Sequence, residues 1–99
     1  MYYYHLISKK EWDQVKDFPS YSPPSLAKEG FIHMSTEVQV PHTAKRIFPG
    51  RTDMLVLKID PARLLAEVKV EPADGDHFPH LFGPLNRDAV VEVNPLLLS

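Results

Sequence analysis

Two histidines lie inside apolar segments of the chain and are the side chains best placed to do chemistry. His5 falls in the aromatic segment 2–7 and His33 in the apolar segment 31–35, and both segments favour β-strands. Imidazole exchanges a proton near neutral pH, so each ring is a candidate for acid–base catalysis or ligand binding. The alternative is a core histidine bonded to the backbone. The presence of both histidines favours a site. If the two strands pair side by side, both rings could project from the same face.

Ser35 follows His33 at the spacing that brings both side chains to the same face of a strand. Alternate residues of a strand lie roughly 6–7 Å apart, which is too far for direct proton transfer from the hydroxyl to the imidazole. A serine-hydrolase pair is therefore excluded, whereas two groups that hold one ligand fit this spacing. Because buried polar groups need hydrogen-bond partners, His33 and Ser35 predict a strand that lines a cleft.

The segment 72–86, "PADGDHFPHLFGPLN", contains three prolines, two glycines and two histidines, and it predicts a long irregular loop. Its apolar residues would anchor the loop and fix His80 over a cleft, unless the loop is merely packed and its histidines are incidental. Glu71 comes directly before it and is a candidate to bind a ribose hydroxyl or to act as a base. Glu71 also alternates with Glu67 and Lys69, a pattern typical of a solvated strand face.

The chain has no cysteine, so a metal site would have to use His, Asp or Glu. Three histidines can bind zinc and leave one coordination position open. No pair of histidines has the short spacing that signals a metal site, so no metal is predicted. His42 and His77 are expected at the surface. Glycine-rich phosphate-binding motifs and the aromatic–basic motifs of RNA-binding sheets are also missing from the sequence.

Length and composition limit the remaining function classes. The 99 residues, with 43% hydrophobic and 24% charged residues, predict a single globular domain over residues 1–99. The net charge of −2, without runs of either sign, gives no basic face for DNA. The N-terminal residues do not form a signal peptide and no apolar run is long enough for a membrane span. A cytoplasmic location is expected.

The alternation of elements predicts an α+β fold with mainly antiparallel strands and two or three short helices. Ser8 and Glu11 form a capping-box pattern that starts the first helix. The predicted order is strand 2–7, a helix after Ser8, a helical turn ending at Gly30, strand 31–35, a helix over 40–48, and strands 54–59, 67–71 and 89–93. Strand 54–59 is apolar almost throughout and is predicted to be central.

Several of these segments together resemble a small bacterial family, domain of unknown function 952. They are "YHLIS" with Trp12, "SLAKEGFIHMS", Gln39-Val40, "LVLKID", "VKVE" and "FPHLFGPL". The resemblance extends in order from Tyr3 to Val93, and "EGFIHMS" and "FPHLFGPL" are its most specific parts. No activity is established for this family. The family is similar to the ADP-ribosyltransferase-like fold and resembles a minimal version of it.

That resemblance implies two small, split β-sheets with a cleft for NAD or an ADP-ribose-like group. It implies that His5 contacts a ribose, that His33 and Ser35 shape a nicotinamide pocket, and that Glu71 or His80 serves catalysis. NAD would then be a substrate rather than a resident cofactor. The chain lacks the Glu-x-Glu or Gln-x-Glu signature of arginine-modifying enzymes and is shorter than typical transferases, which argues against protein modification.

Three functions are compatible with these observations. The first is an enzyme that transfers or hydrolyses an ADP-ribosyl, NAD-like or RNA 2′-phosphate group in a histidine-lined cleft. The second is a non-catalytic module that binds a nucleotide-like small molecule. The third is a structural or interaction domain with a relic cleft, for which the sequence names no protein partner.

Overall fold

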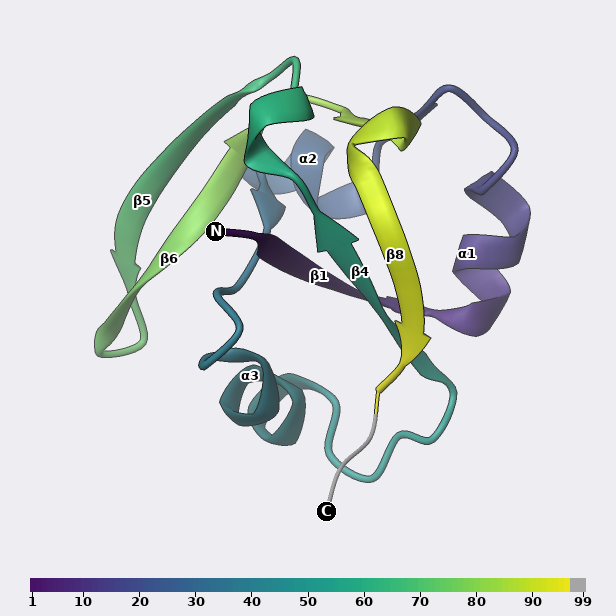
Figure 1. Cartoon of the computed structure of the whole chain (residues 1–99). Helices are drawn as coiled ribbons and strands as arrows, with labels where there is room; N and C mark the ends of the chain where they lie inside the picture. Colours follow the sequence, from purple (N-terminus) through teal and green to yellow (C-terminus); the bar gives the residue numbers. More distant parts are fainter. Residues whose placement is uncertain (97–99) are drawn as a thin grey trace.

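The computed structural model describes residues 1–96 and confirms an α+β fold built from antiparallel strands (Figure 1). Three small sheets have the strand orders β1-β4-β8, β3-β6-β5 and β2-β7. The strands are β1 (Tyr3–Ser8), β2 (Ser20–Tyr21), β3 (Ile32–His33), β4 (Met54–Ile59), β5 (Glu67–Ala73), β6 (Asp76–Phe82), β7 (Leu85–Asn86) and β8 (Val90–Pro95). The helices are α1 (Lys9–Val15), α2 (Pro24–Glu29) and α3 (Val40–Ile47), with 3-10 turns η1 (Pro61–Arg63) and η2 (Arg87–Ala89). No helix within residues 1–96 is long and apolar enough to cross a membrane.

Strand β4 is the central strand of its sheet, as its apolar sequence predicts. It pairs with β1 on one side and with β8 on the other, both antiparallel. Met54, Leu57 and Ile59 of β4 are buried. Leu57 lies directly opposite His5 in the β1–β4 register, so the core of this sheet sits beside the first candidate site residue.

Helix α1 begins where the capping pattern predicts. The Ser8 hydroxyl accepts a hydrogen bond from the Glu11 N–H at 3.1 Å, and Trp12 is buried as the anchor of the helix. The Glu11 carboxylate does not serve the box, because it accepts a hydrogen bond from the hydroxyl of Tyr21 at 2.6 Å. Burial is the main cause that raises the pKa of Tyr21, with the Glu11 hydrogen bond second. Tyr21 therefore stays a neutral donor.

The predicted loop over residues 72–86 is wrong, because most of this segment forms a β-hairpin of β5 and β6. The two strands are joined at Asp74-Gly75, whose φ angles of 52° and 81° suit a tight two-residue hairpin turn. Pro79 lies inside β6, a position that proline rarely takes in a central strand. Its carbonyl still joins the hydrogen-bond network, since it accepts from the Met34 N–H at 3.1 Å.

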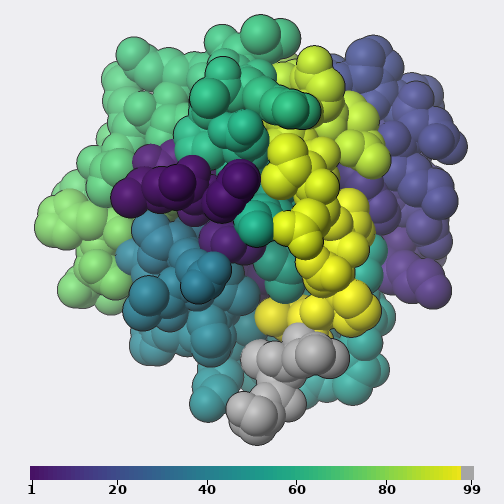
Figure 2. All heavy atoms as spheres, viewed as in Figure 1, coloured from purple at the N-terminus to yellow at the C-terminus, as the bar shows by residue number. Residues whose placement is uncertain are grey.

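The predicted strand 31–35 is divided between two sheets. Only Ile32 and His33 pair with β6. Two residues later, Ser35 forms an isolated antiparallel bridge with Tyr4, with both N–H···O distances at 2.8 Å. Strand β3 therefore does not pair with β1, and the two segments meet only at the Tyr4–Ser35 bridge. Figure 2 shows the purple N-terminal residues between the green hairpin and the blue segment that leads into α3.

Candidate functional site

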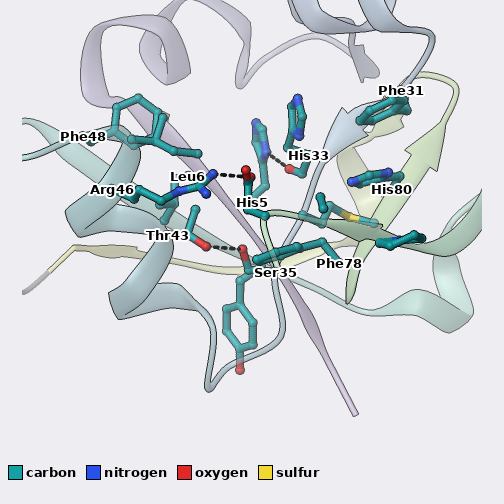
Figure 3. A pocket seen from close by; sticks show the side chains of 16 residues that line it. His5, Leu6, Phe31, His33, Ser35, Thr43, Arg46, Phe48, Phe78 and His80 are labelled. Atoms are coloured by element: carbon teal, nitrogen blue, oxygen red, sulfur yellow. Dashed lines mark hydrogen bonds and ion pairs between the residues drawn. The ribbon is translucent and has the colours of Figure 1, made fainter. Parts of the chain in front are cut away.

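A cavity of about 340 Å³ lies where these segments meet (Figure 3). Its walls come from β1, from the segment around β3, from α3 and from the β5–β6 hairpin. Three of the five histidines line it, namely His5, His33 and His80, while His42 and His77 are exposed elsewhere as expected. Most of the remaining wall is apolar or aromatic, which is typical of a small-molecule site.

His5 is held by the backbone of the neighbouring segment. Its Nδ1 lies 2.7 Å from the carbonyl oxygen of His33. A carbonyl only accepts, so Nδ1 must carry the proton and donate it. Burial lowers the pKa of His5, and the hydrogen bond to His33 opposes this shift only in part. The ring is therefore neutral at pH 7 and leaves Nε2 as a free acceptor.

The lowered pKa of His5 predicts a loss of stability in mild acid. Unfolding restores the ordinary pKa near 6.5, so below that pH the unfolded chain binds more protons than the folded one. The His5 contribution is complete above pH 6.5 and declines as the pH falls towards the folded pKa. We expect the free energy of unfolding of the wild type to fall over this window more than that of His5→Gln, measured by urea titration at several pH values. An equal slope for both proteins would contradict it.

His33 and His80 are each paired with a carboxylate. Nε2 of His33 lies 2.6 Å from Oε2 of Glu29, and Nδ1 of His80 lies 2.8 Å from Oε1 of Glu71. In the neutral rings these nitrogens donate, so Nδ1 of His33 and Nε2 of His80 remain as acceptors. The two rings lie edge to face, with centroids 5.6 Å apart. His33 is exposed, whereas His80 is only 5% exposed.

Glu71 shares its face of β5 with Glu67 and Lys69, as the alternation predicts, and in the hairpin register this face also carries His80 of β6. Glu67 and Lys69 are exposed, but Glu71 is half-buried and turned towards His80, its diagonal neighbour across the hairpin. Glu71 itself does not line the cavity. Any effect of Glu71 on a ligand would therefore pass through His80, whose tautomer and orientation it sets.

Ser35 lies next to helix α3. It is buried, and its Oγ lies 3.3 Å from Oγ1 of Thr43 on α3. The structure thus brings His5, His33, Ser35 and His80 around one cavity. Glu71 lies outside the cavity lining and is linked to the cavity by its hydrogen bond with His80.

Several further residues line the cavity without having been predicted, and three of them bear on its chemistry. Phe31 stacks on the His80 ring, with centroids 4.0 Å apart and planes 13° apart. Arg46 of α3 and Asp74 of the hairpin turn form an ion pair at the cavity wall, and its hydrogen bond lowers the pKa of Asp74. In the sequence, the position of Phe31 directly before "IHMS" is the signal that indicates an aromatic wall. Arg46 and Asp74 are far apart in sequence, and no pattern links them.

The zinc alternative finds no support in the arrangement of these side chains. Within residues 1–96, no group of three or more His, Asp or Glu side chains is placed to hold a metal ion.

Comparisons with known proteins find one family model and similar solved structures. A family model described as "Protein of unknown function (DUF952)" matches residues 6–93. The crystal structure of protein CC0527 from Caulobacter crescentus is similar, with 30% identity, a TM-score of 0.87, and coverage of 100% of this chain and 89% of that chain. The solution NMR structure of CC0527 has 30% identity and a TM-score of 0.83, with coverage of 99% and 86%. No curated protein matches.

Proposed function

The chain belongs to the DUF952 family of proteins of unknown function, and on that premise we propose that its cavity binds an NAD-like ligand and hydrolyses or transfers the ribosyl group. One observation carries the proposal, namely three imidazoles around a single cavity, of which His80 is oriented by Glu71. We also infer a distant relation to ADP-ribosyltransferase-like folds, since the cavity walls come from two small antiparallel sheets.

The hydrogen-bonding character of the cavity supports this class of ligand. One nitrogen of each ring is already used in a hydrogen bond to a carbonyl or carboxylate oxygen, so in their neutral forms His5, His33 and His80 each offer the other nitrogen as an acceptor. A ribose diol and a carboxamide N–H₂ present the matching donors. Phe31 and Phe78 line the same cavity and supply apolar area for a flat ring.

The Glu71–His80 pair supports a proton-transfer role at the ribose. In hydrolysis, Nε2 of His80 would accept a proton from water as its oxygen bonds to the ribose C1′. The glycosidic C–N bond breaks, its electron pair leaves with neutral nicotinamide, and the proton then passes from His80 to solvent. Glu71 stabilises the imidazolium that forms for a moment.

A non-catalytic binding module is the second candidate, and the packing of His80 favours it. The ring is 5% exposed and one of its faces is covered by Phe31. A base with so little accessible area suits a structural hydrogen bond as well as a proton transfer. In that case the cavity would bind the same ligand without turning it over.

Binding is tested by NMR titration with NAD, ADP-ribose and a 2′-phosphorylated dinucleotide, following backbone amides and imidazole signals. We expect saturable shifts at His5, His33, Ser35 and His80. The exposed rings of His42 and His77 lie outside the cavity and serve as internal controls. The imidazole ¹⁵N shifts also report whether Nε2 of His5 and His80 is the free nitrogen.

The titration separates the candidates when it is followed by a turnover assay. Shifts with release of nicotinamide support the enzyme, and shifts without release support the binding module. A lack of shifts at millimolar ligand would overturn both and favour a relic cleft. A preference for the 2′-phosphorylated dinucleotide would move the proposal towards RNA 2′-phosphate chemistry.

A further inference from the structure

The cavity has two chemically different ends. Figure 3 shows Arg46 and Thr43 on one side, Phe31 and His80 on the other, and His5 and His33 between them. Among the cavity-lining residues of the described part of the chain, Arg46 is the single Lys or Arg side chain. A guanidinium stays charged at any working pH, unlike the imidazoles, so this end alone holds a permanent cation.

The present partner of Arg46 is one that a ligand can replace. Arg46 pairs with Asp74, and the two side chains are 43% and 51% exposed. Exposed ion pairs contribute little to stability because solvent screens both charges. A phosphate offers the planar guanidinium a two-point, charge-assisted contact of the kind that arginine binds best.

The side chains next to Arg46 can complete an anion site. Thr43 lies three residues before Arg46 on α3, so both project from the same face of the helix. The Thr43 and Ser35 hydroxyls lie 3.3 Å apart, and the bond between them uses one of their two protons. The second proton is available to an acceptor at this end of the cavity. Both residues line the cavity together with Arg46.

We propose that Arg46 binds a phosphate of the ligand, and that Asp74 holds this position in the free protein and is displaced on binding. Ser35 and Thr43 add hydroxyl contacts. The ligand is thereby oriented, with its phosphate at α3 and its ribosyl group towards the three imidazoles. This assignment rests on the proposed function, since it names the charged part of the same ligand.

Two ligands that differ by one phosphate test the assignment. Nicotinamide mononucleotide and nicotinamide riboside are titrated by calorimetry against the wild type, Arg46→Gln and Asp74→Asn. We expect the wild type to prefer the mononucleotide by about tenfold, and Arg46→Gln to bring the ratio close to one. Asp74→Asn removes the competing carboxylate and should tighten the mononucleotide by about two- to fivefold.

Arg51→Gln is the matched control. Arg51 is also an exposed arginine paired with an aspartate, Asp53, at 2.6 Å, but it does not line the cavity. Arg51→Gln should keep the wild-type ratio of mononucleotide affinity to riboside affinity. An unchanged ratio in Arg46→Gln, or weaker binding of the mononucleotide by Asp74→Asn, would overturn the assignment and leave the proposed function standing.

Inorganic phosphate separates the remaining outcomes, followed by NMR at the Nε–H of Arg46 and of Arg51. If neither nucleotide binds but phosphate shifts Arg46 selectively, the anion site is supported and the proposed function fails. If phosphate shifts both arginines equally or neither of them, and no nucleotide binds, both proposals are overturned.

Discussion

Replacing His80 by Asn is expected to lower the rate of ribosyl hydrolysis by about 10²- to 10⁴-fold, the usual contribution of a general base. Asparagine keeps a polar side chain of similar size under Phe31 but cannot accept a proton from water. The affinity for an NAD-like ligand should change far less than the rate. The measurement is nicotinamide release under saturating ligand, together with a dissociation constant from the NMR titration.

His77→Asn provides the control for this substitution, because it makes the same change in the same strand on an exposed residue outside the cavity. It should leave rate and affinity as in the wild type. Glu71→Gln should lower the rate by a smaller factor and alter its pH profile, because the carboxylate acts through His80. Wild-type turnover in His80→Asn would place the base elsewhere and favour a structural role for the Glu71–His80 pair.

Replacing Leu57 by Ala is expected to lower the free energy of unfolding by about 2–5 kcal/mol. Leu57 is fully buried in the central strand of the β1-β4-β8 sheet, with paired strands on both sides. In a domain of this size, a change of that magnitude lowers the midpoint of thermal unfolding by about 10 °C or more. Urea unfolding followed by circular dichroism measures it.

Leu65→Ala is the comparison that isolates burial from side-chain type. Leu65 is 86% exposed, so its truncation should change the free energy of unfolding by less than about 0.5 kcal/mol. Similar losses of unfolding free energy in Leu57→Ala and Leu65→Ala would contradict this prediction, because burial of Leu57 would then not determine its contribution to stability.

Elements with local signals were predictable from the sequence. Strand β4 has the predicted bounds of 54–59, and helix α1 begins at the predicted cap, because apolar runs and capping hydroxyls act over a few residues. The loop prediction for the segment 72–86 is wrong because proline usually indicates irregular structure rather than a strand. Asp74-Gly75 supplies the tight turn, and the adjacent strands pair on either side of it, so local pairing outweighed the proline signal.

The candidate site was predictable only in part. His5, His33 and Ser35 stood out because polar groups in apolar segments need partners, and His80 stood out because it lies in a segment that predicts a long loop. The structure gathers all four around one cavity. The roles of these residues remain predictions. The orientation of Glu71 depends on the hairpin register, which the predicted loop could not supply.

The bridge between Tyr4 and Ser35 has a consequence for the order of folding. The hairpin that carries His80 is local in sequence and can form early, but the wall that carries His5 closes only when residues far apart in the chain meet. The cavity is thus a property of the fully assembled chain, and no excised fragment should retain it. A ligand that fits it binds the folded state alone and shifts the unfolding equilibrium by mass action, by about 2.7 kcal/mol at a hundredfold excess over its dissociation constant. Thermal denaturation can therefore rank compounds for this protein before any reaction is known.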